Sequence, residues 1–288
     1  MNAADGMVSF QEQITARIRE IESNLCVGLD PSPDAVPAFL HSRPDPQLAW
    51  NQLIIDVTHD LACCYKPNLA FYLARGEEGL RTLRETIHYA NGHQVPVILD
   101  AKFGDIGYTA QYYAQAAFEM LNAGAVTLNP YLGEETLVPF RSYRDRTSFV
   151  LCLTSNMSRI DFQTRSVLRG ELPEAPLFET VAQKVVEWNT EQNLGLVAGA
   201  TAPEELERIR EIAGPSIPIL CPGVGVQGGD LEEALWAGYT GEGSLIINVS
   251  RAIGRASEGP DLGELARQEA AMFVNQYRTF LAQYREAR

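Results

Sequence analysis

Residues 95–105 read VPVILDAKFGD, an apolar run followed by three charged side chains, Asp100, Lys102 and Asp105. The run Val95–Leu99 is continuous in its apolar residues rather than alternating, which is typical of a short strand buried on both faces. Similar runs recur at Leu25–Leu29, Leu61–Tyr65, Ala125–Leu128, Phe149–Leu153, Leu194–Ala198, Ile217–Cys221 and Leu245–Val249. The sequence therefore predicts eight buried strands.

Stretches with helical character separate these runs. They are Gln47–His59, Gly76–Tyr89, Tyr108–Asn122, Pro173–Asn189, Pro203–Ile212 and Asp230–Ala237. Eight buried strands that alternate with helices predict an α/β fold, a single (β/α)8 TIM barrel domain spanning residues 1–288. An open, doubly wound sheet is the main alternative, but the even recurrence without a central break favours the closed barrel.

Two helices outside this alternation complete the predicted fold. The range Phe10–Ile21 has apolar residues on one face and predicts an extra N-terminal helix, which we expect to cover the bottom of the barrel. A last helix carries apolar residues from Leu265 to Tyr284. The connection over residues 155–175 is unusually long for a barrel and is a candidate lid.

The composition excludes several classes of function. The chain has 288 residues and a formal net charge of −14, which argues against binding nucleic acid or an anionic membrane. No apolar run is long enough to cross a membrane, and we recognise no signal peptide. The four histidines lack the spacing of metal ligands, so we expect no metal. The five cysteines form no CxxC pair, and we expect buried thiols in a cytoplasmic protein.

Lysine is rare in this chain. Of the 23 basic residues only three are lysines, Lys66, Lys102 and Lys184. Lysine can exchange its proton near neutral pH when its surroundings perturb it, whereas arginine stays charged. Lys66 and Lys102 follow the second and third apolar runs, so both are candidates for chemistry. Lys184 lies inside a helical stretch and is expected to be an ordinary solvated residue.

The active site of a (β/α)8 barrel lies at the carboxyl ends of its strands. The residues that follow the predicted strands include Asp30, Lys66, Asp100, Lys102, Asp105, Thr154, Ser155, Pro222, Ser250 and Arg251. Asp100 and Lys102 are two residues apart on a strand end, so they should project together into the barrel mouth. Asp105 and Thr109 are four apart at the start of the next helix and should share one face. A carboxylate beside Lys102 would keep it charged as a proton donor.

A glycine-rich loop after the seventh run predicts an anion site. Residues 223–229 read GVGVQGG, and the main-chain N–H groups of such a loop can approach a phosphate closely. Arg251, after the eighth run, offers a planar fork for phosphate oxygens. The loop also fits the dinucleotide fingerprint GxGxxG. No acidic residue follows the next strand to hold a ribose, so we favour a phosphate site.

These residues resemble the orotidine 5′-phosphate decarboxylase family, and most strongly its longer bacterial branch, often called type 2. The resemblance runs from about Val27 to Arg251. Its segments are CVGLDPSPD (26–34), YKPNLAFY (65–72), LDAKFGDIGYTA (99–110), TLNPYLG (127–133), LTSN (153–156), LVAGAT (196–201), PGVGVQGGD (222–230) and NVSRAI (248–253). The DxKxxDIxxT pattern at 100–109 is a specific signature of the family. Phe103, Met157 and Ser158 depart from residues common in this branch.

The resemblance implies a cofactor-independent enzyme of de novo pyrimidine biosynthesis that converts orotidine 5′-phosphate to uridine 5′-phosphate and carbon dioxide. Lys66, Asp100, Lys102 and Asp105 would alternate in charge around the substrate carboxylate. Lys102 would protonate C6 of the pyrimidine as carbon dioxide leaves. The reaction builds negative charge on a ring with no cofactor to accept it, so a preorganised cation is the remaining means of stabilisation.

The resemblance also implies the roles of the binding residues. Asp30 and Lys66 would hold ribose hydroxyls, and Ser155 would contact the pyrimidine. Pro222 would form the pyrimidine loop, Gln227 would bridge a lid to the phosphate, and Arg251 would clamp the phosphate. Asp105 and Thr109 would reach into the site of a second subunit, which implies a homodimer with shared active sites.

Three alternatives remain. A metal-dependent sugar-phosphate decarboxylase or aldolase of the same superfamily shares DxKxxD but uses a carboxylate of the second strand as a Mg²⁺ ligand, where this chain has Lys66. A Schiff-base aldolase using Lys102 is disfavoured because flanking carboxylates keep the amine protonated. A barrel that only binds nucleotides is disfavoured by the full set Lys66, Asp100, Lys102, Asp105 and Arg251.

Overall fold

The computed structural model of the chain describes residues 8–32, 36–170, 172–225 and 228–287. In these residues eight parallel strands form one sheet in the order β2-β1-β10-β9-β8-β5-β4-β3. The strands are β1 Leu25–Leu29, β2 Cys64–Pro67, β3 Ile98–Phe103, β4 Ala125–Leu128, β5 Thr147–Leu153, β8 Leu194–Ala198, β9 Ile219–Pro222 and β10 Leu245–Val249. Bridges from Tyr65 to Val97 and from Asn68 to Asp100 join β2 to β3 and close the barrel. The predicted barrel is confirmed.

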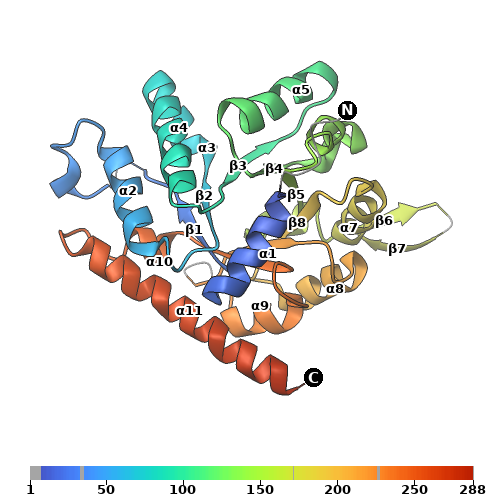
Figure 1. Cartoon of the computed structure of the whole chain (residues 1–288). Coiled ribbons are helices and arrows are strands. Elements are labelled where there is room, and N and C mark those ends of the chain that lie inside the picture. The colour runs from blue at the N-terminus through green and yellow to red at the C-terminus, as the bar shows by residue number, and fades with distance from the viewer. Residues whose placement is uncertain (1–7, 33–35, 171, 226–227, 288) are drawn as a thin grey trace.

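Helices surround the strands on the outside of the barrel (Figure 1). The α-helices are α1 Phe10–Ile21, α2 Pro46–Thr58, α3 Leu69–Leu73, α4 Gly76–Gly92, α5 Gly107–Gln115, α6 Val138–Arg141, α7 Leu177–Trp188, α8 Pro203–Ala213, α9 Leu231–Gly238, α10 Arg251–Gly254 and α11 Leu262–Glu286. Shorter helical turns are η1 Ala38–Leu40, η2 Ala116–Met120, η3 Pro130–Leu132, η4 Glu134–Thr136 and η5 Met157–Asp161. Strands β1, β8 and β10 are buried at every residue, because helices cover their outer face and side chains fill the inside.

Three strands, β2, β3 and β9, begin later than the apolar runs predict. The run from Leu61 opens with a turn, because the N–H groups of Leu61 and Ala62 both donate to the carbonyl of Thr58, and β2 starts only at Cys64. The run from Val95 likewise begins on the end of α4, where the Val95 N–H donates to Ala90. As a result Lys66, Asp100 and Lys102 lie inside β2 and β3 rather than after them.

Helix α1 crosses the amino-terminal end of the barrel, as predicted (Figure 1). The Phe10 ring meets the Phe149 ring edge-on at 6.2 Å, and a Cβ at Gly124 would lie 2.6 Å from Phe10. The Gln11 side chain donates to the carbonyl of Gly243, just before β10, and Arg17 donates to that of Ala62, just before β2. The helix therefore covers the bottom of the barrel and leaves the other end for chemistry.

The long connection after β5 forms an antiparallel hairpin of β6 Ser166–Arg169 and β7 Leu172–Pro176. Figure 1 shows this hairpin projecting away from the barrel. The prediction of a helix from Pro173 is wrong for its first four residues, because residues 173–176 pair with β6 and α7 starts at Leu177.

The structure confirms the predicted surroundings of the cysteines and of Lys184. All five cysteines are buried with free thiols. Lys184 lies on the surface of α7, where its amine is 2.6 Å from Glu187. Among the described residues, no helix combines the length and hydrophobicity that a bilayer crossing needs.

Arg210 of α8 is buried without an acidic partner in the described part of the chain. Its guanidinium donates to four main-chain carbonyls, those of Gly214, Ile217, Gly238 and Ser244, at 2.6–2.8 Å. Burial lowers the pKa of Arg210 to about 10, so the group is still charged at neutral pH. This cation joins the end of α8 to the segments that lead into β9 and β10.

Replacing Arg210 should destabilise the barrel. We expect Arg210→Met to lower the free energy of unfolding by about 3 kcal/mol, because each buried carbonyl left without a donor costs about 1–3 kcal/mol. Urea denaturation measures the loss. Arg208→Met on the same helix is the control, since its exposed ion pairs with Glu179 and Glu211 are worth less than about 1 kcal/mol. Equal losses in the two variants would contradict the role of Arg210.

Candidate active site at the carboxyl end of the barrel

A cavity of about 300 Å³ opens at the carboxyl ends of the strands. It is lined by Asp30, Lys66, Asn68, Asp100, Lys102, Thr127, Leu151, Thr154, Ser155, Asn156, Val197, Leu220, Pro222, Asn248 and Ser250. Six residues that the sequence analysis assigns to the site meet here, namely Asp30, Lys66, Asp100, Lys102, Ser155 and Pro222. They come from five different strand ends, which only the closed barrel brings together.

A chain of alternating charges crosses the floor of this cavity. The Lys66 amine lies 3.0 Å from Asp100 Oδ2, and the Lys102 amine lies 2.5 Å from Asp100 Oδ1. Lys66 is 5% exposed, whereas the Lys102 side chain is 45% exposed. The carboxylate therefore holds one lysine in the interior and presents the other to the cavity.

The electrostatics keep this chain ionised. Burial disfavours the charged form of Lys66, but Asp100 and Asp30 outweigh burial and raise the pKa of the amine above its usual value. Burial also disfavours the charged form of Asp100, yet Lys66 and Lys102 lower the pKa of this carboxyl well below its usual range. Asp100 is thus a carboxylate at neutral pH, with a cation on each oxygen.

A bulge in β3 sets the position of Lys102 beside Asp100. Leu99 pairs with Val126 and Phe103 pairs with Leu128, so Asp100, Ala101 and Lys102 lie opposite the single residue Thr127. Lys102 has a φ of 51°, in the left-handed region that costs a side-chain-bearing residue about 1–2 kcal/mol. The prediction that Asp100 and Lys102 meet is confirmed, but its reason was wrong. The strand does not alternate regularly here, and the bulge redirects the lysine.

The main chain on both sides of Asp30 is held by buried side chains. The Tyr72 hydroxyl donates to the carbonyl of Leu29 at 3.1 Å, and the Gln47 amide donates to that of Pro31 at 3.0 Å. Asp30 Oδ1 is buried and accepts no hydrogen bond from the described residues. This oxygen lines the cavity as an acceptor for a donor group of a ligand.

A smaller cavity of about 60 Å³ adjoins the first and shares Pro222, Asn248 and Ser250 with it. Arg251 lines this second cavity, is exposed, and makes no ion pair with a described residue. A guanidinium in this state is suited to bind an anion such as a phosphate.

The glycine-rich loop beside Arg251 differs from the expectation. The N–H groups of Gly225, Gly228 and Gly229 donate to carbonyls within the loop itself, at 2.7–3.1 Å. These glycines serve to close a tight turn, for which Gly223, Gly225 and Gly228 adopt positive φ. Gln227 lies outside the described residues, so its predicted role has no structural account.

Asp105 and Thr109 do not line the cavity of their own chain. Helix α5 begins at Gly107, so Asp105 precedes the helix, and the predicted shared helical face is wrong. Asp105 Oδ1 accepts the N–H of Ile106, and Thr109 is exposed on the first turn of α5.

The sequence analysis gave no role to four polar residues that line the cavity, Asn68, Thr127, Asn156 and Asn248. The Asn248 amide donates to Ser250 Oγ at 3.3 Å and accepts the thiol of Cys26. Ser250 fits only because position 28 is glycine, where a Cβ would come within 1.8 Å of Ser250 Oγ. Thr127 and Asn248 are each a single polar residue inside a buried apolar run. This sequence pattern could have identified both as candidates for the site.

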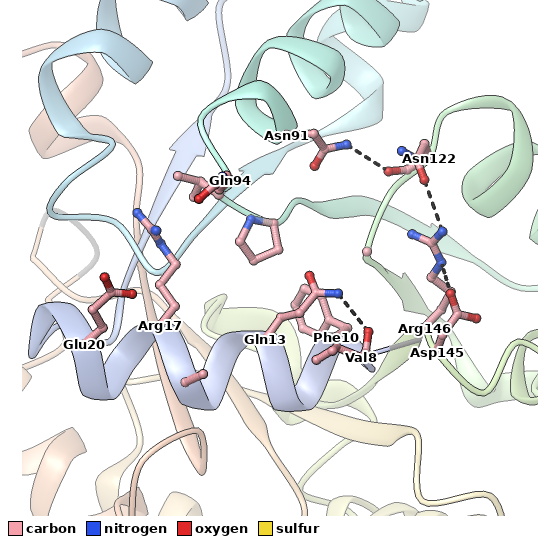
Figure 2. Close-up of a pocket in the computed structure, with 14 residues that line it drawn as sticks. Val8, Phe10, Gln13, Arg17, Glu20, Asn91, Gln94, Asn122, Asp145 and Arg146 are labelled. Carbon is pink, nitrogen blue, oxygen red and sulfur yellow. Dashed lines mark hydrogen bonds and ion pairs between the residues drawn. The ribbon is translucent and has the colours of Figure 1, made fainter. Parts of the chain in front are cut away.

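A larger cavity, of about 690 Å³, lies beneath α1 at the opposite end of the barrel (Figure 2). Figure 2 shows Arg146 already bound to Asp145 and Asn122. Arg17 donates to the main-chain carbonyls of His59 and Ala62. This cavity holds neither strand-end lysine, and we place the chemistry at the carboxyl end. Within the described residues, no three His, Cys, Asp or Glu side chains gather to hold a metal ion.

Comparisons with known proteins identify relatives over most of the chain. A sequence model described as the Orotidine 5′-phosphate decarboxylase / HUMPS family matches residues 23–261. Orotidine 5′-phosphate decarboxylase of Natronomonas pharaonis is 48% identical over 253 residues, 88% of this chain and 90% of that protein. The same enzyme of Herpetosiphon aurantiacus is 46% identical over 92% of this chain and 96% of its own length. The structure of Leishmania donovani OMP decarboxylase has a TM-score of 0.78 and 38% identity, covering 94% of this chain and 99% of that chain.

The stability of the protein should depend on pH through Asp100. A carboxyl whose pKa is lowered on folding stabilises the fold above its unfolded pKa of about 3.9, and this contribution is lost as the pH falls through the folded pKa. We therefore expect the thermal midpoint to fall more steeply below about pH 5 in the unmodified protein than in Asp100→Asn. Asp161→Asn, on the exposed turn η5, is the control. Parallel curves for the unmodified protein and Asp100→Asn would refute the coupling.

Proposed function

The chain belongs to the orotidine 5′-phosphate decarboxylase / HUMPS family, and we propose that its barrel mouth converts orotidine 5′-phosphate to uridine 5′-phosphate and carbon dioxide, with Lys102 as proton donor. The observation that carries the proposal is the ionised chain from Lys66 through Asp100 to Lys102 on the floor of the cavity. Membership of the family confirms the resemblance seen in the sequence. Assignment to the longer bacterial branch stays a prediction.

The proposed reaction moves one electron pair and one proton. The bond from C6 of the pyrimidine to the carboxylate breaks, its electron pair stays on C6, and carbon dioxide leaves. Lys102 Nζ then gives a proton to C6 and regains one from water. Lys102 fits this role better than Lys66, because its side chain is 45% exposed whereas Lys66 is 5% exposed. A cation already in place where negative charge develops needs no reorganisation during the reaction.

Asp100 contributes to the proposed reaction by its charge. It remains a carboxylate, so a substrate carboxylate placed beside it is raised in energy until carbon dioxide departs. No cofactor takes part in this scheme.

We assign the remaining predicted residues to the ribose, the pyrimidine and the phosphate of the substrate. We propose that Asp30, with its open oxygen, and Lys66 bind ribose hydroxyls, and that Ser155 and Pro222 contact the pyrimidine. Arg251 binds the phosphate in the adjoining cavity. Gln227 is proposed as a bridge to the phosphate from the sequence alone. Binding the distant phosphate supplies energy that can be used at C6.

A second subunit would supply Asp105 and Thr109. Both residues lie outside their own cavity, and Tyr108, which precedes Thr109 in the chain, is 81% exposed. Aromatic residues are enriched at protein interfaces. We therefore propose a homodimer of one-domain barrels, residues 1–288, in which each active site is shared. The five free thiols support the proposed cytoplasmic location.

The metal-dependent sugar-phosphate enzyme is the weaker alternative. Relatives of 46–48% identity carry the name of the decarboxylase. In addition, the buried amine of Lys66 stands where that reaction needs a metal-binding carboxylate, and a cation raises the energy of a nearby metal ion.

The purified protein should convert orotidine 5′-phosphate to uridine 5′-phosphate at the same rate with and without EDTA. The loss of substrate absorbance measures the rate. Absence of turnover would refute the decarboxylase, and loss of activity on chelation would restore the metal-dependent alternative.

Substitution of the proton donor should stop the reaction. We expect Lys102→Ala to lower kcat by at least about a thousand-fold, because it removes both the proton and the preorganised charge. Lys184→Ala is a matched control at an exposed lysine and should retain full activity. A Lys102→Ala enzyme with ordinary kcat would show that another group donates the proton.

Mixed dimers test the shared site. Co-expressed Lys102→Ala and Asp105→Ala subunits should recover about a quarter of the activity, since half of the dimers formed at random carry one intact site of two. Lys102→Ala with Lys66→Ala is the control and should recover none, because both lysines belong to the same chain's cavity. No recovery with the first pair would count against Asp105 acting across the dimer.

A further inference from the structure

We propose that Thr127 is a positioning residue of the reaction, which sets Lys102 for proton transfer through the bulge of β3. The proposal rests on the proposed function and assigns a role to a side chain of β4 that the reaction scheme does not use. Thr127 is 1% exposed, lines the cavity, and is the one residue of β4 opposite Asp100, Ala101 and Lys102.

The Thr127 hydroxyl forms hydrogen bonds with the first and last residues of the bulge, Asp100 and Lys102. It accepts the main-chain N–H of Lys102 at 2.9 Å and donates to Asp100 Oδ1 at 2.9 Å. An N–H can only donate and a carboxylate can only accept, so the hydroxyl has a single orientation that satisfies both partners. The hydroxyl proton is donated to Asp100, and one lone pair accepts the N–H of Lys102. These are two residues of the charge chain.

The same oxygen of Asp100 receives the Lys102 amine. Asp100 Oδ1 accepts the Thr127 hydroxyl and also lies 2.5 Å from Lys102 Nζ. Thr127 therefore holds Lys102 at two points, directly at its main-chain N–H and indirectly through the oxygen that its amine contacts. This matters because the Lys102 side chain is half exposed and has few other restraints.

The left-handed backbone of Lys102 depends on such support. A residue other than glycine stays at a φ of 51° only where its surroundings hold it there. Thr127 is 1% exposed, and a methyl group in place of its hydroxyl would leave the Lys102 N–H without this acceptor. Without it, we infer that the bulge relaxes and moves the amine away from the reacting carbon.

The test is Thr127→Val, which keeps the shape of the side chain and removes the hydroxyl. We expect kcat to fall about a hundred-fold, the loss that a misplacement of about 1 Å produces. KM should change little, because the groups proposed to bind ribose and phosphate are untouched. Thr127→Ser keeps the hydroxyl and should restore most of kcat. Steady-state kinetics on orotidine 5′-phosphate and the thermal midpoint are measured for each variant.

Thr136→Val is the matched control. Thr136 is fully buried, and its hydroxyl has no hydrogen-bond partner among the described residues, so the same substitution there removes no bond. Both kcat and KM should stay as in the unmodified enzyme. If Thr127→Val does not fold, Thr127→Cys makes the same comparison, because a thiol is a weak donor and acceptor.

The outcomes separate the two proposals. Unchanged kcat in Thr127→Val, an equal fall in Thr136→Val, a rise in KM alone, or failure of Thr127→Ser to restore kcat would each overturn the positioning role. An unmodified enzyme that does not turn over orotidine 5′-phosphate would instead refute the proposed function, and the role of Thr127 with it.

Discussion

The carboxylate of Asp100 is buried between two ammonium groups, and much of the site depends on this arrangement. A carboxylate removed from water is costly unless it is paired and hydrogen-bonded. Lys66 takes one oxygen, and Lys102 with Thr127 takes the other. Asp100 also forms one of the two bridges that join β2 to β3. The residue that organises the charges therefore sits where the barrel closes.

The two lysines have different surroundings because the barrel gives them different positions. Lys66 lies within a regular strand and is only 5% exposed. Lys102 lies on a bulge with a left-handed backbone, and its side chain reaches toward solvent. Backbone strain of this kind concentrates at functional sites, where the surrounding structure holds it. The strained lysine is the one to which we assign the proton transfer.

The sequence predicted the barrel and most of the strand-end residues. Runs such as Leu25–Leu29 and Leu245–Val249 coincide with strands, because continuous apolarity is typical of strands buried on both faces. It could not predict the bulge, since regular alternation was the only rule available for Asp100 and Lys102. Thr127 was missed because a threonine in a buried strand is common and its two partners become visible only in three dimensions. The prediction of a helix failed at residues 173–176, because these residues pair locally with β6, whereas the lid role of residues 155–175 stays a prediction.

The bulge of β3 has a consequence for anyone who transfers this site to another barrel. Three residues of β3 lie opposite one residue of β4. The geometry of the site therefore depends on the number of residues in each strand as well as on which residues they are. Deleting two residues between Leu99 and Phe103 would leave one residue opposite Thr127 and favour a regular ladder without the bulge. A graft that copies Asp100, Lys102 and Thr127 into strands of equal length would lack the bulge. It would therefore not place these three side chains in the arrangement seen here.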